Sequence, residues 1–143
     1  MNELTMPDKI ERLKAATRHL DQIEIPTQHF LLEGMYVRQT FIKAGTVFIG
    51  RTHKKPHFFM CLKGRAEVTV GEEILQITAG MTLMCTPGTR RAGFTIEDTV
   101  FAGVFRTDQK DLEDIEAELT EYDPTARYGV SNEILPLELI CDV

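Results

Sequence analysis

Residues 45–64 read GTVFIGRTHKKPHFFMCLKG, and this stretch decides which fold the sequence predicts. Two histidines, His53 and His57, lie between two glycines, and Arg51 precedes them. The apolar runs on either side, VFIG and FFMCL, are typical of short buried strands, and KKP is typical of a short loop between them. Three interpretations of these polar residues are open: a metal site, a catalytic pocket, or the plain wall of a β-barrel.

The spacing of apolar residues changes on both sides of this stretch. From Pro7 to about Ile23 they recur at helical intervals, which predicts an amphipathic helix. From Phe30 to about Arg106, β-rich runs are separated by glycine and proline, as in sandwiches and barrels. Helical spacing returns after Asp108 and predicts a second surface helix.

The clearest pair of strands lies at 65–77, RAEVTVGEEILQI. Ala66, Val68 and Val70 alternate with polar residues, and Gly71 and its neighbours then turn the chain into a second run. Such alternation predicts a hairpin with one face in water.

The β-rich centre resembles the cupin family through two motifs. The first cupin motif has the form Gly-x5-His-x-His-x3-Glu-x6-Gly, and the interval from Gly45 to Gly64 keeps this spacing. Arg51 stands where the first histidine belongs, His53 matches the second, and His57 takes the place of the glutamate. The frame of the motif is therefore present, with altered residue types.

The second cupin motif resembles the segment that begins at Gly80 and continues through Thr86-Pro87-Gly88. Arg91 falls at the histidine position of this motif, and Thr95 falls at the final asparagine. The resemblance implies an all-β double-stranded β-helix, a cupin-like jelly-roll barrel, with flanking N-terminal and C-terminal helices. We expect an N-terminal helical segment at 1–25, the cupin-like β-barrel at 26–107, and a C-terminal helix and tail at 108–143.

The resemblance also implies a divalent metal, because cupin sites bring several imidazoles and a carboxylate to one ion. His53 and His57 are the two matched imidazoles here, and Cys61 has the strand parity to join them in a site for zinc, nickel or iron. A metal-dependent enzyme, such as a dioxygenase or an isomerase, would use these ligands. Arginine supplies no lone pair, so Arg51 and Arg91 weigh against this interpretation.

The first hypothesis is instead a cationic pocket for a small anionic metabolite, which is phosphorylated, nucleotide-linked, sugar-linked or a carboxylate. Arg51 and Arg91, together with His53 and His57, would bind this anion without a metal, because guanidinium groups suit phosphate and carboxylate. The resemblance offers a precedent in metal-free nucleotide-sugar epimerases, which use a histidine base and arginines. The alternative is that both arginines point outward and pair with acids at the rim.

His53 is the candidate general base, because repulsion from the arginines would keep its imidazole neutral. Tyr36 and Arg38 share one strand face and, with Arg106, are candidates to line the same cavity. The alternative for that strand is a solvated face. Whether the chain is an enzyme is left open at this point.

Composition excludes several classes of partner. The formal charge of −6 and the pI near 5.2 argue against nucleic acid and anionic membranes. No apolar run has the length of a membrane span and no apolar signal region begins the chain, which predicts a cytoplasmic protein. Cys61, Cys85 and Cys141 are an odd number without framework spacing, which favours reduced thiols.

Two strand segments, FFMCL and VFIG, are apolar on both faces, which predicts cover on the outside as well as in the core. We therefore expect a homodimer. A third hypothesis for function is a non-catalytic oligomeric scaffold, in which side chains fill the barrel and the helices and tail contact another protein.

Overall fold

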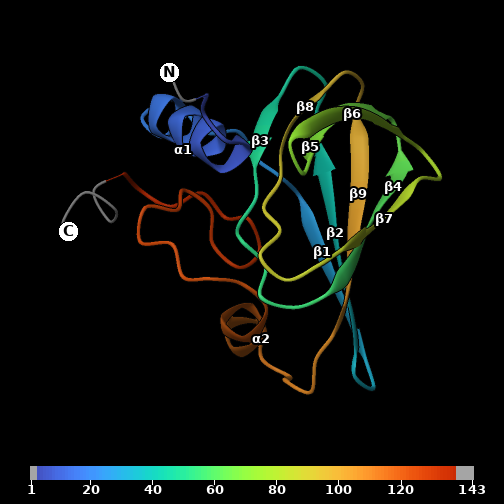
Figure 1. The fold of residues 1–143 in the computed structure, drawn as a ribbon. Coiled ribbons are helices and arrows are strands. Elements are labelled where there is room, and N and C mark those ends of the chain that lie inside the picture. Colours follow the sequence, from blue (N-terminus) through green and yellow to red (C-terminus); the bar gives the residue numbers. More distant parts are fainter. Residues whose placement is uncertain (1–2, 138–143) are drawn as a thin grey trace.

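The computed structural model describes residues 3–137 and contains two facing antiparallel β-sheets with two helices (Figure 1). One sheet has the strand order β1 (Thr27–Leu32), β2 (Met35–Ile42), β9 (Thr99–Arg106), β4 (His57–Lys63) and β7 (Thr82–Cys85). The other has the order β3 (Val47–Ile49), β8 (Ala92–Thr95), β5 (Arg65–Val70) and β6 (Glu73–Thr78). From β2 to β9 the chain crosses repeatedly between the two sheets. The predicted all-β architecture with flanking helices is confirmed.

The core lies between the two sheets and follows from the alternation of side chains along each strand. In β4, Phe59 and Cys61 are buried, whereas the intervening Phe58 is 47% exposed on the opposite face. Ala66 and Val68 of β5 are fully buried from the other sheet. Full burial of such an apolar side chain contributes about 1.5 to 3 kcal/mol, so this interface holds the sheets together.

The hairpin predicted at 65–77 is confirmed as β5 and β6. Val70 pairs with Glu73, and the intervening turn contains Gly71 at φ 60°. A second glycine, Gly64 at φ 86°, joins β4 to β5. Both glycines have the left-handed backbone conformation that other residues rarely adopt.

Helix α1 (Met6–Thr17) begins with a capping box in which Thr5 and Asp8 satisfy each other's backbone amides. Its buried residues Met6 and Ile10 pack against the second sheet. The helix predicted as far as Ile23 in fact ends at Thr17. Beyond it the backbone leaves the helix, and carbonyl groups there accept hydrogen bonds from the C-terminal segment.

Helix α2 (Leu112–Leu119) confirms the predicted second surface helix. Ile115 and Leu119 pack on Tyr36 and Phe105 of the first sheet. Across residues 3–137, no helix is long and apolar enough to cross a bilayer.

The segment 120–137, which we call the C-terminal segment, runs back beside α1 after leaving α2 (Figure 1). Asp123 pairs with Lys14 of α1 at 2.7 Å, and the Tyr128 hydroxyl donates to the Ile23 carbonyl at 2.7 Å. The end of the predicted tail, residues 138–143 with Cys141, lies outside the described residues.

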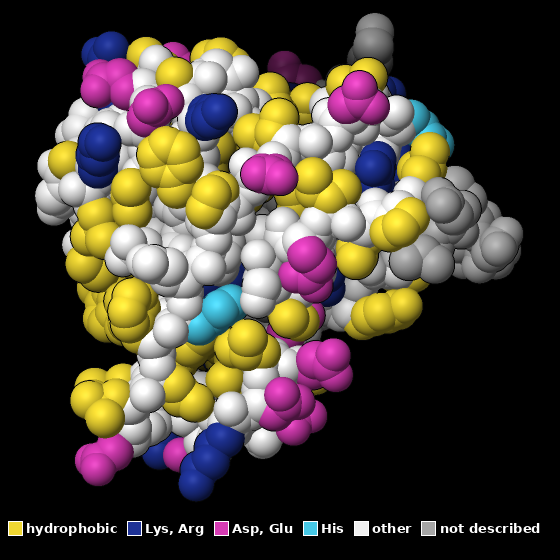
Figure 2. Space-filling view, turned by 180° about the vertical axis from the view of Figure 1, so that it is seen from behind, with side chains coloured by type: hydrophobic (Ala, Val, Ile, Leu, Met, Phe, Trp, Pro, Cys, Tyr) yellow, Lys and Arg dark blue, Asp and Glu magenta, His cyan; other side chains and the backbone are white. Residues whose placement is uncertain are grey.

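The outer face of the five-stranded sheet carries a row of apolar side chains in register. Phe30, Val37, Val104, Phe58 and Met84 lie opposite one another across β1, β2, β9, β4 and β7. Met84 is 84% exposed and Phe30 is 52% exposed. Hydrophobic side chains gather along the left of the space-filling view (Figure 2). A continuous apolar face of this kind is typical of a protein interface.

We propose that two copies of the chain pack through this face, and we predict that Phe58→Lys produces monomers. A lysine there would bury an unpaired charge at the centre of the interface. Light scattering at micromolar concentration should give twice the mass of 16.2 kDa for the unmodified protein and the single mass for Phe58→Lys. Ile74→Lys, at an exposed position of the other sheet, is the control and should leave the dimer intact. A single mass for the unmodified protein would contradict the proposal.

Candidate functional site

A cavity of about 490 Å³ lies on the inner side of the first sheet and is lined by both sheets, α2 and the C-terminal segment. Strand β2 contributes one face, because Tyr36, Arg38, Thr40 and Ile42 alternate inward along it. Tyr36 and Arg38 therefore line the cavity, and the alternative of a solvated face does not hold for this side of the strand. The cavity also shows that side chains do not fill the barrel entirely, whereas a filled barrel would have favoured the scaffold hypothesis.

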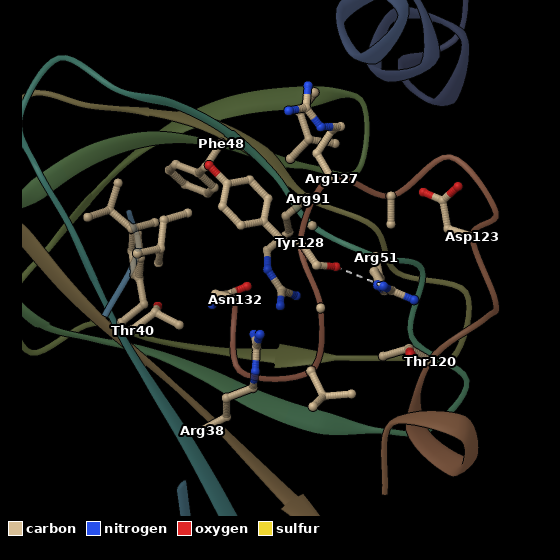
Figure 3. Close-up of a pocket in the computed structure, with 18 of the residues that line it drawn as sticks. Arg38, Thr40, Phe48, Arg51, Arg91, Thr120, Asp123, Arg127, Tyr128 and Asn132 are labelled. Atoms are coloured by element: carbon tan, nitrogen blue, oxygen red, sulfur yellow. Dashed lines mark hydrogen bonds between the residues drawn. The ribbon is translucent and has the colours of Figure 1, made fainter. Parts of the chain in front are cut away.

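Two arginines face each other across this cavity. Arg38 extends from β2, Arg91 extends from the segment just before β8, and their guanidinium groups point toward one another (Figure 3). Within residues 3–137, neither guanidinium has a carboxylate within salt-bridge distance. Two like charges therefore lie in a largely buried space without a directly paired carboxylate among the described residues, although Glu116 and Glu133 are near enough to favour the charge of Arg38.

Two other cations that line the cavity, Arg51 and Lys14, are paired with carboxylates. Arg51 contacts Glu116 of α2 at 3.3 Å and donates to the Tyr128 carbonyl at 3.1 Å. Lys14 is paired with Asp123. Arg51, predicted to bind the ligand beside Arg91, therefore lines the cavity but uses its guanidinium to hold α2 and the C-terminal segment.

The Arg91 side chain is buried and held by three neighbours. It donates to His57 Nε2 at 3.2 Å and contacts Cys85 Sγ at 3.2 Å. Its guanidinium carbon lies 4.0 Å from the centre of the Phe59 ring, a cation–π contact. Burial lowers the pKa of both Arg91 and Arg38, yet a guanidinium remains protonated in proteins.

The hydrogen bonds of His57 define its protonation state. Its Nδ1 lies 3.1 Å from the Lys55 carbonyl, which can only accept, so Nδ1 carries the proton. Its Nε2 faces the Arg91 guanidinium, which can only donate, so Nε2 presents a lone pair. His57 is thus inferred to be neutral. Burial, chiefly, and the Arg91 charge lower its pKa against the effect of the Lys55 carbonyl.

His53 lies in the cavity wall beside His57, with ring centres 4.3 Å apart. Its Nδ1 is buried and has no hydrogen-bond partner among the described residues. Burial first, then the charge of Arg91, lower the pKa of His53 to about 3. The predicted lowering has the right direction, but burial contributes more than the arginines do.

We expect the His53 ring to stay neutral from pH 7.5 to pH 4.5 in an NMR titration. Because its folded pKa lies below the ordinary value of 6.5, the unfolded chain binds more protons between about pH 6.5 and pH 3. The folded state therefore loses stability as the pH falls through that window. A peptide of residues 49–57 provides the unfolded reference. A His53 resonance that moves with a midpoint near 6.5 in the folded protein would contradict this assignment.

The residues of the site do not fit the metal that the cupin resemblance implies. His53 and His57 are brought together, but the Cys61 thiol contacts the carbonyls of Lys63 and Gly64 instead. Among residues 3–137, no group of three His, Cys, Asp or Glu side chains could hold an ion. The lone pair of His57 Nε2 is moreover occupied by an Arg91 N–H.

Of the two other residues predicted to line the cavity, Tyr36 does so and Arg106 does not. The Tyr36 hydroxyl is 2.7 Å from His29 Nδ1, and His29 Nε2 is 3.0 Å from Ser131 Oγ, so the phenol at the cavity wall is linked to the surface. Arg106 is exposed at the end of β9 and does not line the cavity. Its parity along β9 places it on the face opposite the inward Phe105.

The C-terminal segment contributes residues that the sequence did not single out. Tyr128 and Asn132 line the cavity, and Asn132 lies beside the two arginines (Figure 3). Asn132 donates to Thr27 Oγ1 at 2.7 Å. No periodic pattern marks this segment, so a sequence signal for these contacts is lacking.

Comparison with solved structures shows that the chain has the cupin fold. Ectoine synthase from P. lautus matches with a TM-score of 0.56 and 23% identity over 71% of this chain and 78% of that one. KdgF from Halomonas sp. matches with a TM-score of 0.54 and 14% identity over 64% and 88%. A cupin superfamily protein from Desulfitobacterium hafniense matches with a TM-score of 0.53 and 10% identity over 63% and 84%.

No protein-family model and no curated protein sequence matches the chain. The similarity is therefore one of fold, and the chemistry of the site has to be argued from its own residues.

Proposed function

We propose that this cupin-fold protein binds a small anionic metabolite between Arg38 and Arg91. The observation that carries the proposal is the pair of facing guanidinium groups without carboxylate partners. Planar guanidinium groups donate two parallel hydrogen bonds to phosphate or carboxylate oxygens. An anion placed between them would accept hydrogen bonds from both guanidinium groups.

The surroundings of the pair support binding of a charge. Low-dielectric walls strengthen the attraction between an anion and the two cations. The His53 ring is a further polar group in the cavity wall. His53 is neutral at physiological pH, so it is the candidate general base if the bound metabolite reacts. The binding proposal itself requires no reaction.

The competing hypotheses have less support. A metal-dependent dioxygenase or isomerase would need a third donor beside His53 and His57, and Arg91 stands in that space. A scaffold would not need an open cavity lined by unpaired arginines. Cys61 and Cys85, which are both free and buried, support our further proposal of a cytoplasmic location.

Calorimetric titration with inorganic phosphate and with short carboxylates tests the proposal. We expect measurable binding by the unmodified protein and a loss of affinity of about a hundredfold in Arg38→Gln, because a charge-assisted bidentate contact is removed. Arg106→Gln, at the exposed end of β9, is the matched control and should bind normally. Equal affinities of Arg38→Gln and the unmodified protein would overturn the proposal, as would the failure of every anion to bind.

A further inference from the structure

We infer that the ligand of this site is a phosphate monoester with a single phosphate and an apolar, aromatic or aliphatic, organic body. This inference rests on the proposed function and narrows it to one chemical class. It follows from the charge of the arginine pair, from the partners of the neighbouring cations and from the apolar side of the cavity.

The arginine pair matches a group with two negative charges. Arg38 and Arg91 carry one positive charge each, and His53 and His57 are neutral. A carboxylate carries one negative charge and would leave one of the two guanidinium groups without a directly bound anion. A phosphate monoester carries a charge of about −1.5 to −2 at neutral pH and has three terminal oxygens for donors that approach from opposite sides. The count of charges therefore favours phosphate.

The side of the cavity nearest Arg51 offers no equivalent place for a second phosphate. On the side of Arg51, Thr120 and Asp123 in Figure 3, Arg51 is paired with Glu116 and Asp123 is paired with Lys14. A second anion there would have to displace a carboxylate from its partner and would be repelled by the remaining acid. A diphosphate, such as that of a nucleotide-sugar, is therefore a poor match.

The opposite side of the cavity is apolar. Figure 3 places Phe48 and Thr40 on this side of the arginine pair. Phe48 packs tilted against Phe101 with ring centres 5.4 Å apart, and Phe59 stacks on Phe101 with ring centres 4.7 Å apart. The apolar residues that line this part of the cavity are Ile25, Ile42, Phe48, Phe59 and Phe101.

Such a surface favours an apolar ligand body over a sugar. Buried hydroxyl groups need hydrogen-bond partners. Figure 3 shows the Tyr128 hydroxyl beside Phe48 and Asn132 and Thr40 on the same side, and the first two already donate to the Ile23 carbonyl and to Thr27. An aromatic or aliphatic body needs no such partners and buries its surface against the phenylalanines. A cavity of about 490 Å³ is also far larger than inorganic phosphate requires and lies within the usual range for organic ligands.

The test is a ranking of four probes by calorimetry at neutral pH with the unmodified protein. We expect phenyl phosphate to bind about tenfold or more tightly than glycerol 3-phosphate, inorganic phosphate and benzoate, because only phenyl phosphate supplies both the dianion and the apolar body. Tighter binding of benzoate would overturn the choice of phosphate. Tighter binding of glycerol 3-phosphate would overturn the apolar body.

Variants then locate the apolar contact. Phe48→Ser should weaken phenyl phosphate about tenfold and leave inorganic phosphate unchanged, whereas Phe94→Ser, at a position 43% exposed on the neighbouring strand, should change neither. Unchanged phenyl phosphate affinity in Phe48→Ser would contradict the inference.

The ranking of probes needs no variant, so it decides the question even if Phe48→Ser unfolds. If no probe binds at all, the proposed function itself fails. If all four bind equally, anion binding stands and only this inference fails.

Discussion

Arg38→Met should raise the melting temperature of the ligand-free protein while it abolishes anion binding. In the free protein the Arg38 guanidinium is largely buried, faces Arg91 and has no carboxylate partner within residues 3–137. Replacing a buried charge with an apolar side chain of similar length often stabilises a protein. We expect a gain of about 1 to 2 kcal/mol in the free energy of unfolding, or about 3 to 6 °C.

Calorimetric melting in phosphate-free buffer measures this effect. Arg106→Met is the control, because the same substitution at an exposed position should change the melting temperature little. Arg91→Met should lose binding without gaining stability, since Arg91 also donates to His57 and stacks on Phe59. A lower melting temperature for Arg38→Met would show that Arg38 stabilises the ligand-free fold. It would contradict the idea that the Arg38–Arg91 pair is retained for anion binding at a cost in stability.

Gly64→Ala should cause a large loss of stability, because the added methyl group would meet the backbone. Gly64 has φ 86°, and a Cβ there would lie 2.2 Å from the Asp98 carbonyl oxygen and 2.7 Å from Thr99 Oγ1. The carbonyl belongs to the backbone, so the turn from β4 to β5 would have to move. We expect a loss of about 4 kcal/mol or more, a large fraction of the stability of a typical domain.

Gly71→Ala separates the two causes of this loss. Gly71 also has a positive φ, 60°, but a Cβ there meets nothing within 4 Å. The backbone conformation alone should cost about 1 to 2 kcal/mol. Urea unfolding gives the free energy of unfolding of both variants, and the difference between Gly64→Ala and Gly71→Ala represents the clash with Asp98. If both variants lose the same free energy of unfolding, the positive φ alone, and not the close approach of Asp98, would explain why residue 64 is a glycine.

Features that depend on local spacing could be predicted from the sequence. The β5–β6 hairpin follows from the alternation at 65–77, and the inward face of β2 follows from the shared parity of Tyr36 and Arg38. Motif spacing likewise indicated that Arg91 and His53 belong to the site. These predictions need only the period of a strand and the frame of a known motif.

Features that depend on distant segments could not be predicted in this way. Cys61 has the same strand parity as His57, but four residues of extended chain separate their backbones by about 13 Å, too far for one metal ion. Arg51 pairs with Glu116 of α2, a helix far along the chain from Arg51. The end of α1 at Thr17 depends on contacts with the C-terminal segment, which no local pattern marks.

The C-terminal segment also has a consequence for the order in which the molecule forms. Its contacts with the N-terminal region join residues 109 positions apart in Lys14–Asp123 and 105 apart in Ile23–Tyr128. Closing such long loops costs entropy before any contact is gained, so we expect this wall of the cavity to assemble after the sheets. Pulsed hydrogen exchange during refolding should then protect amides of β4 and β5 earlier than those of 125–132. Simultaneous protection would show that the binding cavity and the sheets form in one step.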